Sequence, residues 1–505
     1  MLLYNTSLLI ILVFLAVPLV LRLYITQKAT TFREYAVGNK RLHTSRLVTT
    51  FLATLFGGGV LMREIPNVYD KGIVHIIIIG SFFLHIYIIH LLGLRMGPFM
   101  QHLSIADTIG NVYGKYPRMI TALLATSCAI GFVAIQINVM SSAIGMCMDA
   151  IDASMVIFLA TLVLVSYAIF GGMRTVIMTD LLQFVTFTIV IPLLIKFVFI
   201  KADKSFLEAI SLLQMQEKFQ FKKLFQFDKK VLNMVLNNLY YAIAFNPAII
   251  QHIYMSTSPI QVKKVFLRVT LWGLIISGGI FLIALFVFIG DSTLLKEEIW
   301  LHILTDMSPA YRICVVISIL VMTISTGDFA LHIAAIMVSH DMMESMRGIQ
   351  ATPYIQQLRL SKLIKLVGGL LAMIITFYHP NLFALTKFIF EYFIGCFAIT
   401  VVPPFILAVF GFRGTASTAL MGMAIGILVI LTWNHWVQPK IEIDGKFIAI
   451  ISNGLTMVAA HYLLFQPPGK GWIEPDDQQK RIKQLIQAFK KFKKSIDLDS
   501  VVIKS

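Results

Sequence analysis

The chain has 505 residues, of which 58% are hydrophobic and only 13% are charged. This composition carries more apolar surface than a soluble protein of this length needs, so it predicts a polytopic membrane protein and excludes a soluble fold. The formal net charge is +16. In a soluble protein this excess would indicate a nucleic-acid partner. In a membrane protein it is typical of cytoplasmic loops that face anionic lipid, so we expect membrane lipid and no nucleic acid as a partner.

Apolar runs of spanning length occur along the whole chain and predict about thirteen transmembrane helices. They lie at 5–25, 43–69, 72–97, 117–148, 153–172, 175–200, 232–256, 266–290, 309–338, 361–379, 383–411, 416–436 and 446–465. The first run has no charged start and no small-residue cleavage site, so we expect a retained helix rather than a signal peptide.

The charges of the loops predict the orientation of the chain. An odd number of spans places the two termini on opposite sides, and most loop lysines and arginines are cytoplasmic if the N-terminus is outside. The lysine-rich stretch Lys201–Lys230 conflicts with this orientation, because it would then lie outside. Since no targeting peptide is present, we expect a bacterial inner membrane with the C-terminus in the cytoplasm.

The span from His43 to Tyr69 is interrupted by three consecutive glycines, Gly57, Gly58 and Gly59. Glycine costs roughly 1 kcal/mol against alanine inside a helix, so we expect the helix to open here. An opened helix at membrane depth is tolerated where its carbonyl groups line a cavity or bind an ion or solute. Close helix packing through small residues is the alternative.

Charged side chains inside spans are the next candidates, because they are rare in membranes and mark functional sites. Arg63 and Glu64 follow the glycines, and they either neutralise each other or face a solute. Asp180 lies about two helical turns into its span. It is either a functional carboxylate or a partner of Arg174 near the interface.

Two later spans carry polar groups at membrane depth. In the sequence FNP the proline removes a backbone hydrogen bond and bends the helix, and Asn246 offers an amide beside the bend. A plain kink is the alternative. In VMTISTGD, at 321–328, hydroxyls and a carboxylate fall within about two helical turns. Isolated hydroxyls often bond only to their own helix. Adjacent Ser325 and Thr326 beside a buried carboxylate instead suit an alkali cation, which prefers hard oxygen donors.

Residues 467–505 leave the membrane pattern. Between Gln478 and Lys494 apolar positions alternate with lysines, which predicts a basic amphipathic helix on the cytoplasmic face. Anchoring to the membrane surface is the favoured role of this helix, and binding to a specific partner is the alternative.

Four segments, in order, resemble motifs of the sodium:solute symporter family. FREYAVGNKRL at 32–42, followed by ATLFGGG, is similar to the entry to the first core helix of that family. YAIFGGMRT at 167–175, followed by TDLLQ, is similar to its signature of a tyrosine and a double glycine. NPAIIQ at 246–251 resembles its "QP-x-x-x-Q" turn, and MTISTGD at 322–328 resembles its "A-x-M-S-T-A-D" segment. The resemblance covers about residues 32 to 410.

The resemblance implies an all-α, LeuT-type fold with a five-plus-five inverted-repeat core. It divides the chain into an extra N-terminal helix at 1–30, the transporter core at 31–411 with repeats at about 43–200 and 232–411, two additional helices at 412–466, and the tail at 467–505.

The resemblance also implies a sodium site. Its ligands would be the backbone carbonyls of Ala53, Phe56 and Met322 and the hydroxyls of Ser325 and Thr326. Family members with a second sodium site use an aspartate that matches Asp180, together with hydroxyls one turn beyond Ser325. Here Asp328 and Phe329 hold those later positions, which argues against a second sodium site. Asp180 and Asp328 are therefore the candidates for a second cation or a proton.

The nearest polar or open positions for a solute are Gly57, Gly58, Gly59, Arg63, Gln136 and Asn246. Leu239 and Ile243, two turns and one turn before Pro247, are aliphatic where characterised carriers often present aromatic or polar side chains. Sugars and proline therefore lose support as solutes. If Arg63 faces the cavity, a carboxylate-bearing or amino-acid-like solute is favoured, because arginine binds carboxylates bidentately.

The leading hypothesis is a secondary active transporter that couples inward flow of Na+ to uptake of a small organic solute. A proton-coupled carrier that uses Asp180 or Asp328, and a membrane sensor that binds solute without transporting it, are the alternatives. The intramembrane residues form no nucleophile–base pair and no metal-ligand spacing, so we expect no enzyme activity.

Overall fold

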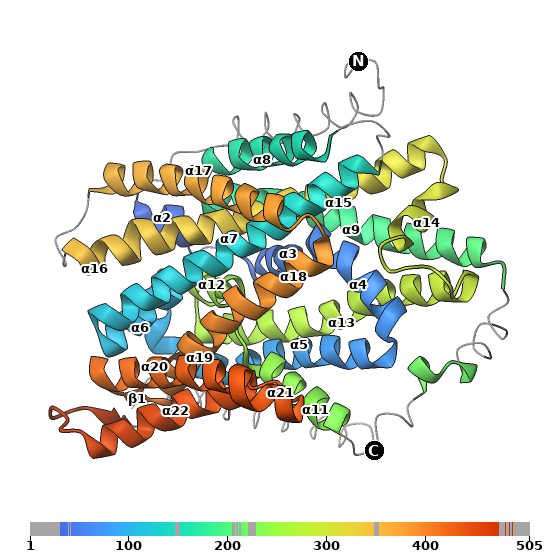
Figure 1. Cartoon of the computed structure of the whole chain (residues 1–505). Coiled ribbons are helices and arrows are strands. Elements are labelled where there is room, and N and C mark those ends of the chain that lie inside the picture. The colour runs from blue at the N-terminus through green and yellow to red at the C-terminus, as the bar shows by residue number, and fades with distance from the viewer. Residues whose placement is uncertain are drawn as a thin grey trace, which may run out of the picture.

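The computed structural model describes residues 31–146, 152–204, 214–220, 229–347 and 353–473, apart from 39 and 41, together with the isolated positions 208, 211, 480, 484 and 487. In these parts the chain is a bundle of long helices (Figure 1). The expected span at 5–25 and most of the expected amphipathic tail lie outside the described residues.

The first half of the chain contains the elements α2 (Phe32–Val37), α3 (Thr44–Leu55), α4 (Gly58–Lys71), α5 (Ile73–Leu92), the 3-10 helix η2 (Gly93–Phe99), α6 (Ile105–Tyr113), α7 (Lys115–Gly145), α8 (Ala153–Ile169), α9 (Met173–Ala202) and the 3-10 turn η3 (Glu217–Phe219). The second half contains α11 (Lys229–Ile243), α12 (Pro247–Met255), α13 (Pro259–Gly290), α14 (Ile299–Thr305), α15 (Pro309–Ile336), the π-helix η5 (Met337–Met342), α16 (Met343–Arg347), α17 (Tyr354–Tyr378), α18 (Leu382–Phe388), the π-helix η6 (Ile389–Ile394), α19 (Gly395–Phe410), β1 (Phe412–Arg413), α20 (Ala416–Thr432), the π-helix η7 (Trp433–Val437), α21 (Gln438–Ile441), α22 (Lys446–Leu463) and β2 (Gly471–Trp472). β1 and β2 pair in antiparallel fashion, with Phe412 opposite Trp472.

The helices confirm the all-α polytopic fold. Among the described residues, nine helices are long and apolar enough to cross a membrane, and the bent pair α3 and α4 makes a tenth. The remaining predicted spans correspond to α8, which is apolar but has only 17 residues, and to 232–256, which is split between α11 and α12. The predicted number of thirteen is therefore not confirmed.

The glycine run forms a true break, which we call the first break. α3 ends at Leu55 and α4 begins at Gly58, and the two helices are bent by 57°. The same glycines also allow close packing. A Cβ atom at Gly57 would lie 2.3 Å from Thr326 Oγ1, and one at Gly58 would lie 2.0 Å from Thr323 Oγ1. Both interpretations of the run, an opened helix and close packing, therefore apply here.

The expected bend at Asn246 is also a complete break, which we call the second break. α11 ends at Ile243, and α12 begins at Pro247. Asn246 caps α12, since its side-chain Oδ1 accepts a hydrogen bond of 3.0 Å from the Ile249 N–H. Proline suits the first helical position, because the N–H that it lacks would have no partner there.

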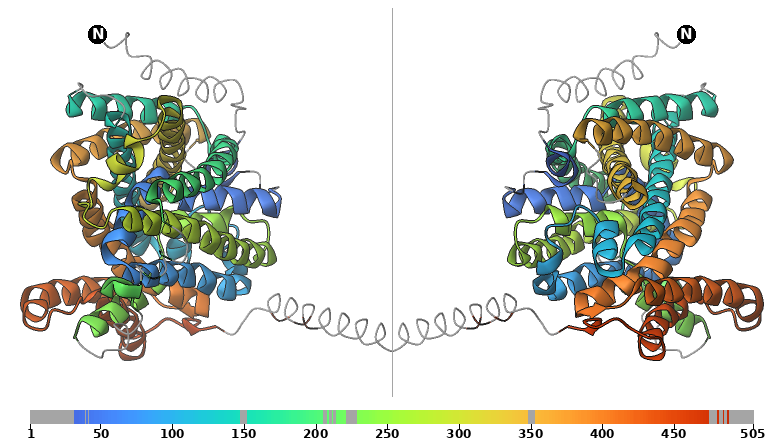
Figure 2. Two further views of the ribbon diagram at one scale, coloured as in Figure 1. Left: turned by 90° about the vertical axis from the view of Figure 1, so that its right-hand side faces the viewer. Right: turned by 90° about the vertical axis from the view of Figure 1, so that its left-hand side faces the viewer.

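The helix α15 is central to the bundle. It contacts α3, α4, α7, α8, α9, α12 and α17, and in Figure 1 it crosses the middle of the molecule with α7. Most of its residues from Val315 to Ile336 are buried. Polar side chains on α15 therefore need partners inside the protein. The C-terminal helices α20 and α22 lie at the edge opposite α8 and α17 (Figures 1 and 2).

Candidate functional site

Hydroxyl groups of α15 lie at the first break. Thr326 lies against Gly57, and its Oγ1 donates a hydrogen bond of 3.0 Å to the Met322 carbonyl of the same helix. Ser325 faces α9, where its Oγ donates to Asp180 Oδ1 over 2.5 Å. Asp180 is buried, whereas Arg174 is exposed. The Asp180 carboxylate therefore belongs to the cluster on α15.

The α9 side chain Gln183 contacts the end of α3. Its Nε2 donates hydrogen bonds to two backbone carbonyls, that of Ala53 over 2.8 Å and that of Phe56 over 3.2 Å. Gln183 lies three residues after Asp180, so both side chains project from one face of α9. In the sequence, Gln183 is only the last residue of the TDLLQ segment. Its contact could not be predicted, because it depends on how α9 packs against the break.

These contacts place the five expected ion ligands at the end of α3 and on the part of α15 that packs against the first break. The carbonyls of Ala53 and Phe56 share Gln183, Ser325 is bonded to Asp180, and Thr326 follows Ser325 and bonds to Met322. All the acceptor atoms are oxygens, and Asp180 supplies a carboxylate next to them. Hard oxygen donors at a broken helix suit Na+, so the residues present fit this cation.

Asp328 and Thr323 are further polar side chains on α15, on different sides of the helix. Asp328 is fully buried one turn after Ser325. Thr323 Oγ1 donates to the Ile319 carbonyl over 2.6 Å and lies against Gly58. Thr323 therefore serves the packing of α15 against α4.

A cavity of about 140 Å³ lies beside the first break. Of the expected solute residues, Gly57, Gly59, Arg63, Gln136 and Asn246 line it. Gly58 packs against α15 instead, since a Cβ atom there would meet Thr323 and the Ile319 carbonyl. The cavity also borders Thr326, one of the expected ion ligands.

Arg63 contacts a neighbouring carboxylate and also lines the cavity. Its Nε and Nη2 lie 2.7 Å and 2.5 Å from Glu64 Oε1, and Glu64 Oε2 contacts Nε2 of His75 on α5. The guanidinium also lies over the Phe390 ring, 5.0 Å from its centroid. Arg63 is therefore paired with Glu64 and also lines the cavity.

The remaining cavity wall is largely apolar, and its aromatic members are Phe82, Phe132, Tyr240, Tyr241, Phe329 and Phe390. Among the described residues, Gln136 Oε1 and the Tyr240 hydroxyl are buried without a hydrogen-bond partner. Leu239 and Ile243 are not among the residues that line the cavity, and the Leu239 side chain is 43% exposed. Residues 244–246, between these positions and Pro247, are not helical.

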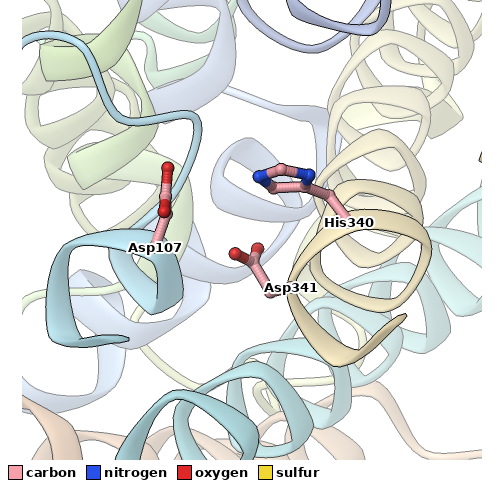
Figure 3. Close-up of side chains that lie close together, drawn as sticks. All are labelled: Asp107, His340 and Asp341. Atoms are coloured by element: carbon pink, nitrogen blue, oxygen red, sulfur yellow. The ribbon is translucent and has the colours of Figure 1, made fainter. Parts of the chain in front are cut away.

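A second polar cluster lies where α6, α7 and η5 meet. Figure 3 shows Asp107, His340 and Asp341, whose side-chain ligand atoms lie within 4.8 Å of one another. Arg118 donates to Asp341 Oδ1 from Nε and Nη2, over 3.1 Å and 2.9 Å. The other oxygen, Asp341 Oδ2, accepts a hydrogen bond of 2.7 Å from Ser104. Both Asp341 oxygens are thus engaged, so this cluster fits a network of ion pairs better than a metal site.

Positively charged residues gather at the same end of the bundle. Arg33 Nη2 donates to Gln101 Oε1 over 2.6 Å, and Lys40 Nζ donates to the Met100 carbonyl. Burial and the nearby Arg33 lower the pKa of Lys40 to about 8. The pKa of His102 is also lowered, chiefly by burial. These contacts fasten α2 to the loop that precedes α6.

A membrane-embedded helix bundle with a broken helix, oxygen ligands at the break and a small cavity beside them defines a secondary transporter. The chain matches the model of the sodium:solute symporter family over residues 35–426 and belongs to this family. It is a sodium-coupled solute symporter, as the resemblance implied. No curated protein sequence matches the chain.

Solved structures support the fold. The chain is similar to a Na+-coupled sialic acid symporter in its substrate-bound, outward-open state, with a TM-score of 0.79 and 18% identity over 93% of this chain and 99% of that one. It is also similar to a nucleobase-cation-symport-1 family transporter with bromovinylhydantoin bound, with a TM-score of 0.60 and 12% identity over 85% and 94% of the two chains. The LeuT-type core is thereby confirmed.

Proposed function

We propose that the sodium ion that drives transport binds at the first break. Its ligands are the carbonyls of Ala53, Phe56 and Met322 and the hydroxyls of Ser325 and Thr326, with the Asp180 carboxylate as the nearby counter-charge. The observation that carries this proposal is that α9 contacts both sides of the site, since Gln183 bonds to the end of α3 and Asp180 accepts from Ser325 on α15. An ion held by α3 and α15 together ties these helices to each other.

The solute binds in the adjacent cavity, which borders both the break and Thr326. Ion and solute then share Gly57 and Thr326 as neighbours, so each favours the arrangement of α4 and α15 that suits the other. This shared wall is the physical basis of coupling, because a ligand shifts a conformational equilibrium only through its differential contacts with the two states.

The cavity chemistry supports an amino-acid-like solute. Arg63 offers a positive group for a carboxylate, and Gln136 Oε1 is a buried acceptor that suits an N–H or ammonium donor. The aromatic wall suits an apolar body. Because Glu64 already binds Arg63, a solute carboxylate shares the guanidinium with Glu64 rather than neutralising a free charge.

The orientation follows from the two ends of the bundle. The end with Arg33, Lys40 and Arg118 is cytoplasmic under the positive-inside rule. The opposite end, with Asp291 and Asp306, faces outward. In the inner membrane of a bacterium this places the N-terminus outside and the C-terminus in the cytoplasm, with a membrane potential that favours inward movement of Na+.

A thermal-shift screen in sodium buffer tests the solute class. We expect an amino-acid-like compound to raise the melting temperature in sodium and to lose this effect in Arg63→Gln, since the carboxylate then lacks its partner. Arg95→Gln is the matched control, because Arg95 also lies 5.0 Å from the centroid of an aromatic ring, that of Phe410, but does not line the cavity. Equal stabilisation by the amide analogue of the same compound would contradict the carboxylate assignment.

Proton coupling is the second candidate, and the burial of Asp328 beside the ion ligands favours it. A carboxylate inside a membrane span is a candidate member of a proton pathway. Uptake that follows a pH gradient, ignores sodium and is abolished by Asp328→Asn would establish this mechanism. Uptake that requires sodium and survives Asp328→Asn would exclude it.

A further inference from the structure

One nitrogen atom bridges the two carbonyls of the first break. Gln183 Nε2 lies 2.8 Å from the Ala53 oxygen and 3.2 Å from the Phe56 oxygen. Gln183 is completely buried, so water cannot replace these bonds without entering the protein. The amide therefore supplies partners for two carbonyl oxygens that the end of α3 leaves without a helical partner.

The chemistry of the contact determines which end of the amide faces the break. Carbonyl oxygens only accept hydrogen bonds, so the NH2 group must point at them and the amide oxygen must point away. Gln183 Oε1 is buried and, in the described part of the chain, has no hydrogen-bond partner. The amide oxygen of Gln183 thus lacks a hydrogen bond in the described part of the chain, whereas the amide nitrogen donates to both carbonyls.

Nε2 of Gln183 lies within hydrogen-bond reach of both carbonyl oxygens, so a cation that binds the two oxygens from the same side meets the amide nitrogen there. The N–H groups carry partial positive charge and repel a cation at the same oxygens. We propose that Gln183 competes with sodium for the Ala53 and Phe56 carbonyls, so that the ion must displace the amide to bind. This proposal rests on the sodium site given above and adds a residue that lowers its affinity.

The competition links ion binding to helix movement. The bond from Gln183 joins α9 to the end of α3, whereas sodium joins α3 to α15. When sodium binds, α3 loses a bond to α9 and gains one to α15. When sodium leaves, the amide returns, and the carbonyls at the break do not remain unpaired inside the membrane.

Direct binding of radioactive sodium to the purified full-length protein tests this proposal. Gln183→Leu and Gln183→Met both remove the N–H donors and keep most of the side-chain volume. We expect half-maximal binding at about a three- to tenfold lower sodium concentration in both variants, because a competing hydrogen bond is lost. We also expect both variants to melt at a lower temperature in potassium, because the two carbonyls lose their partner.

Asn453→Leu is the matched control. Asn453 is a buried amide whose Nδ2 donates to two carbonyls, that of Ile399 over 2.7 Å and that of Thr400 over 3.2 Å. These bonds join α22 to α19, away from the first break. The control variant should melt at a lower temperature and bind sodium at the same concentration as the parent protein.

The outcomes separate the two proposals. If the parent protein binds no sodium, the sodium site itself is wrong. If the parent binds sodium and both Gln183 variants need the same concentration or more, competition is wrong and Gln183 is a ligand or a structural residue. If one Gln183 variant does not fold, the other is used, because leucine and methionine differ in shape and both lack N–H donors.

Discussion

The two helix breaks differ in where their polar groups find partners. At the second break the start of α12 is capped within its own segment, since Asn246 caps the helix and Pro247 needs no N–H partner. At the first break the partners come from other helices, because Gln183 on α9 binds the carbonyls and Thr326 on α15 packs against Gly57.

This difference indicates different roles. A break that caps itself is a fixed bend, and the second break shapes the wall of the cavity. A break that depends on neighbouring helices can exchange one partner for another, which an ion site in a moving transporter requires. The predictions below test whether the first break depends on its neighbours and the second does not.

The largest effect is expected when the partners on α15 are removed. Ser325→Ala together with Thr326→Ala should abolish sodium-driven uptake while leaving expression intact, because two of the five proposed ion ligands are lost. Ser318→Ala is the control, since the Ser318 hydroxyl donates only to the Cys314 carbonyl of its own helix. Normal uptake by the double variant would show that the first break does not hold the ion through α15.

A smaller effect is expected when the close approach of α4 and α15 is blocked. A Cβ atom at Gly58 would lie 2.0 Å from Thr323 Oγ1 and 2.7 Å from the Ile319 carbonyl. Overpacking of this kind costs typically about 1–3 kcal/mol, so Gly58→Ala should lower the free energy of unfolding by that amount. Denaturant titration measures the change. Gly80→Ala is the control, because a Cβ atom at Gly80 meets nothing within 4 Å and should not destabilise the protein.

The smallest effect is expected at the second break. Asn246→Ala removes the cap of α12 and should cost about 1 kcal/mol of stability, the usual value for a lost helix cap. It should leave the sodium concentration for half-maximal binding unchanged, because the Asn246 side chain caps its own segment. Asn246→Ser, which keeps a capping oxygen, should recover most of the lost stability. A large change in sodium affinity would place the second break in the ion site.

The sequence predicted features that depend on local chemistry. Three glycines indicated the first break, proline and asparagine indicated the second, and the order of motifs indicated the family. The partners between helices were not predictable in this way. The hydrogen bonds from Gln183 to the carbonyls of α3 depend on how separate helices pack, and so does the pairing of Glu64 with His75. No single segment of the sequence encodes this packing. The sequence did not predict that Tyr240 lines the cavity, because the second break changes the helical phase.

The most direct test of the sodium site is the thermal melting of purified protein titrated with sodium against potassium at constant ionic strength. A ligand at a hundred times its dissociation constant stabilises the folded state by roughly 2.7 kcal/mol, which a melt detects. The account predicts a rise specific to sodium that disappears when Ser325 and Thr326 are both changed to alanine. Identical melting in the two salts, or a sodium response that survives in the double variant, would contradict it.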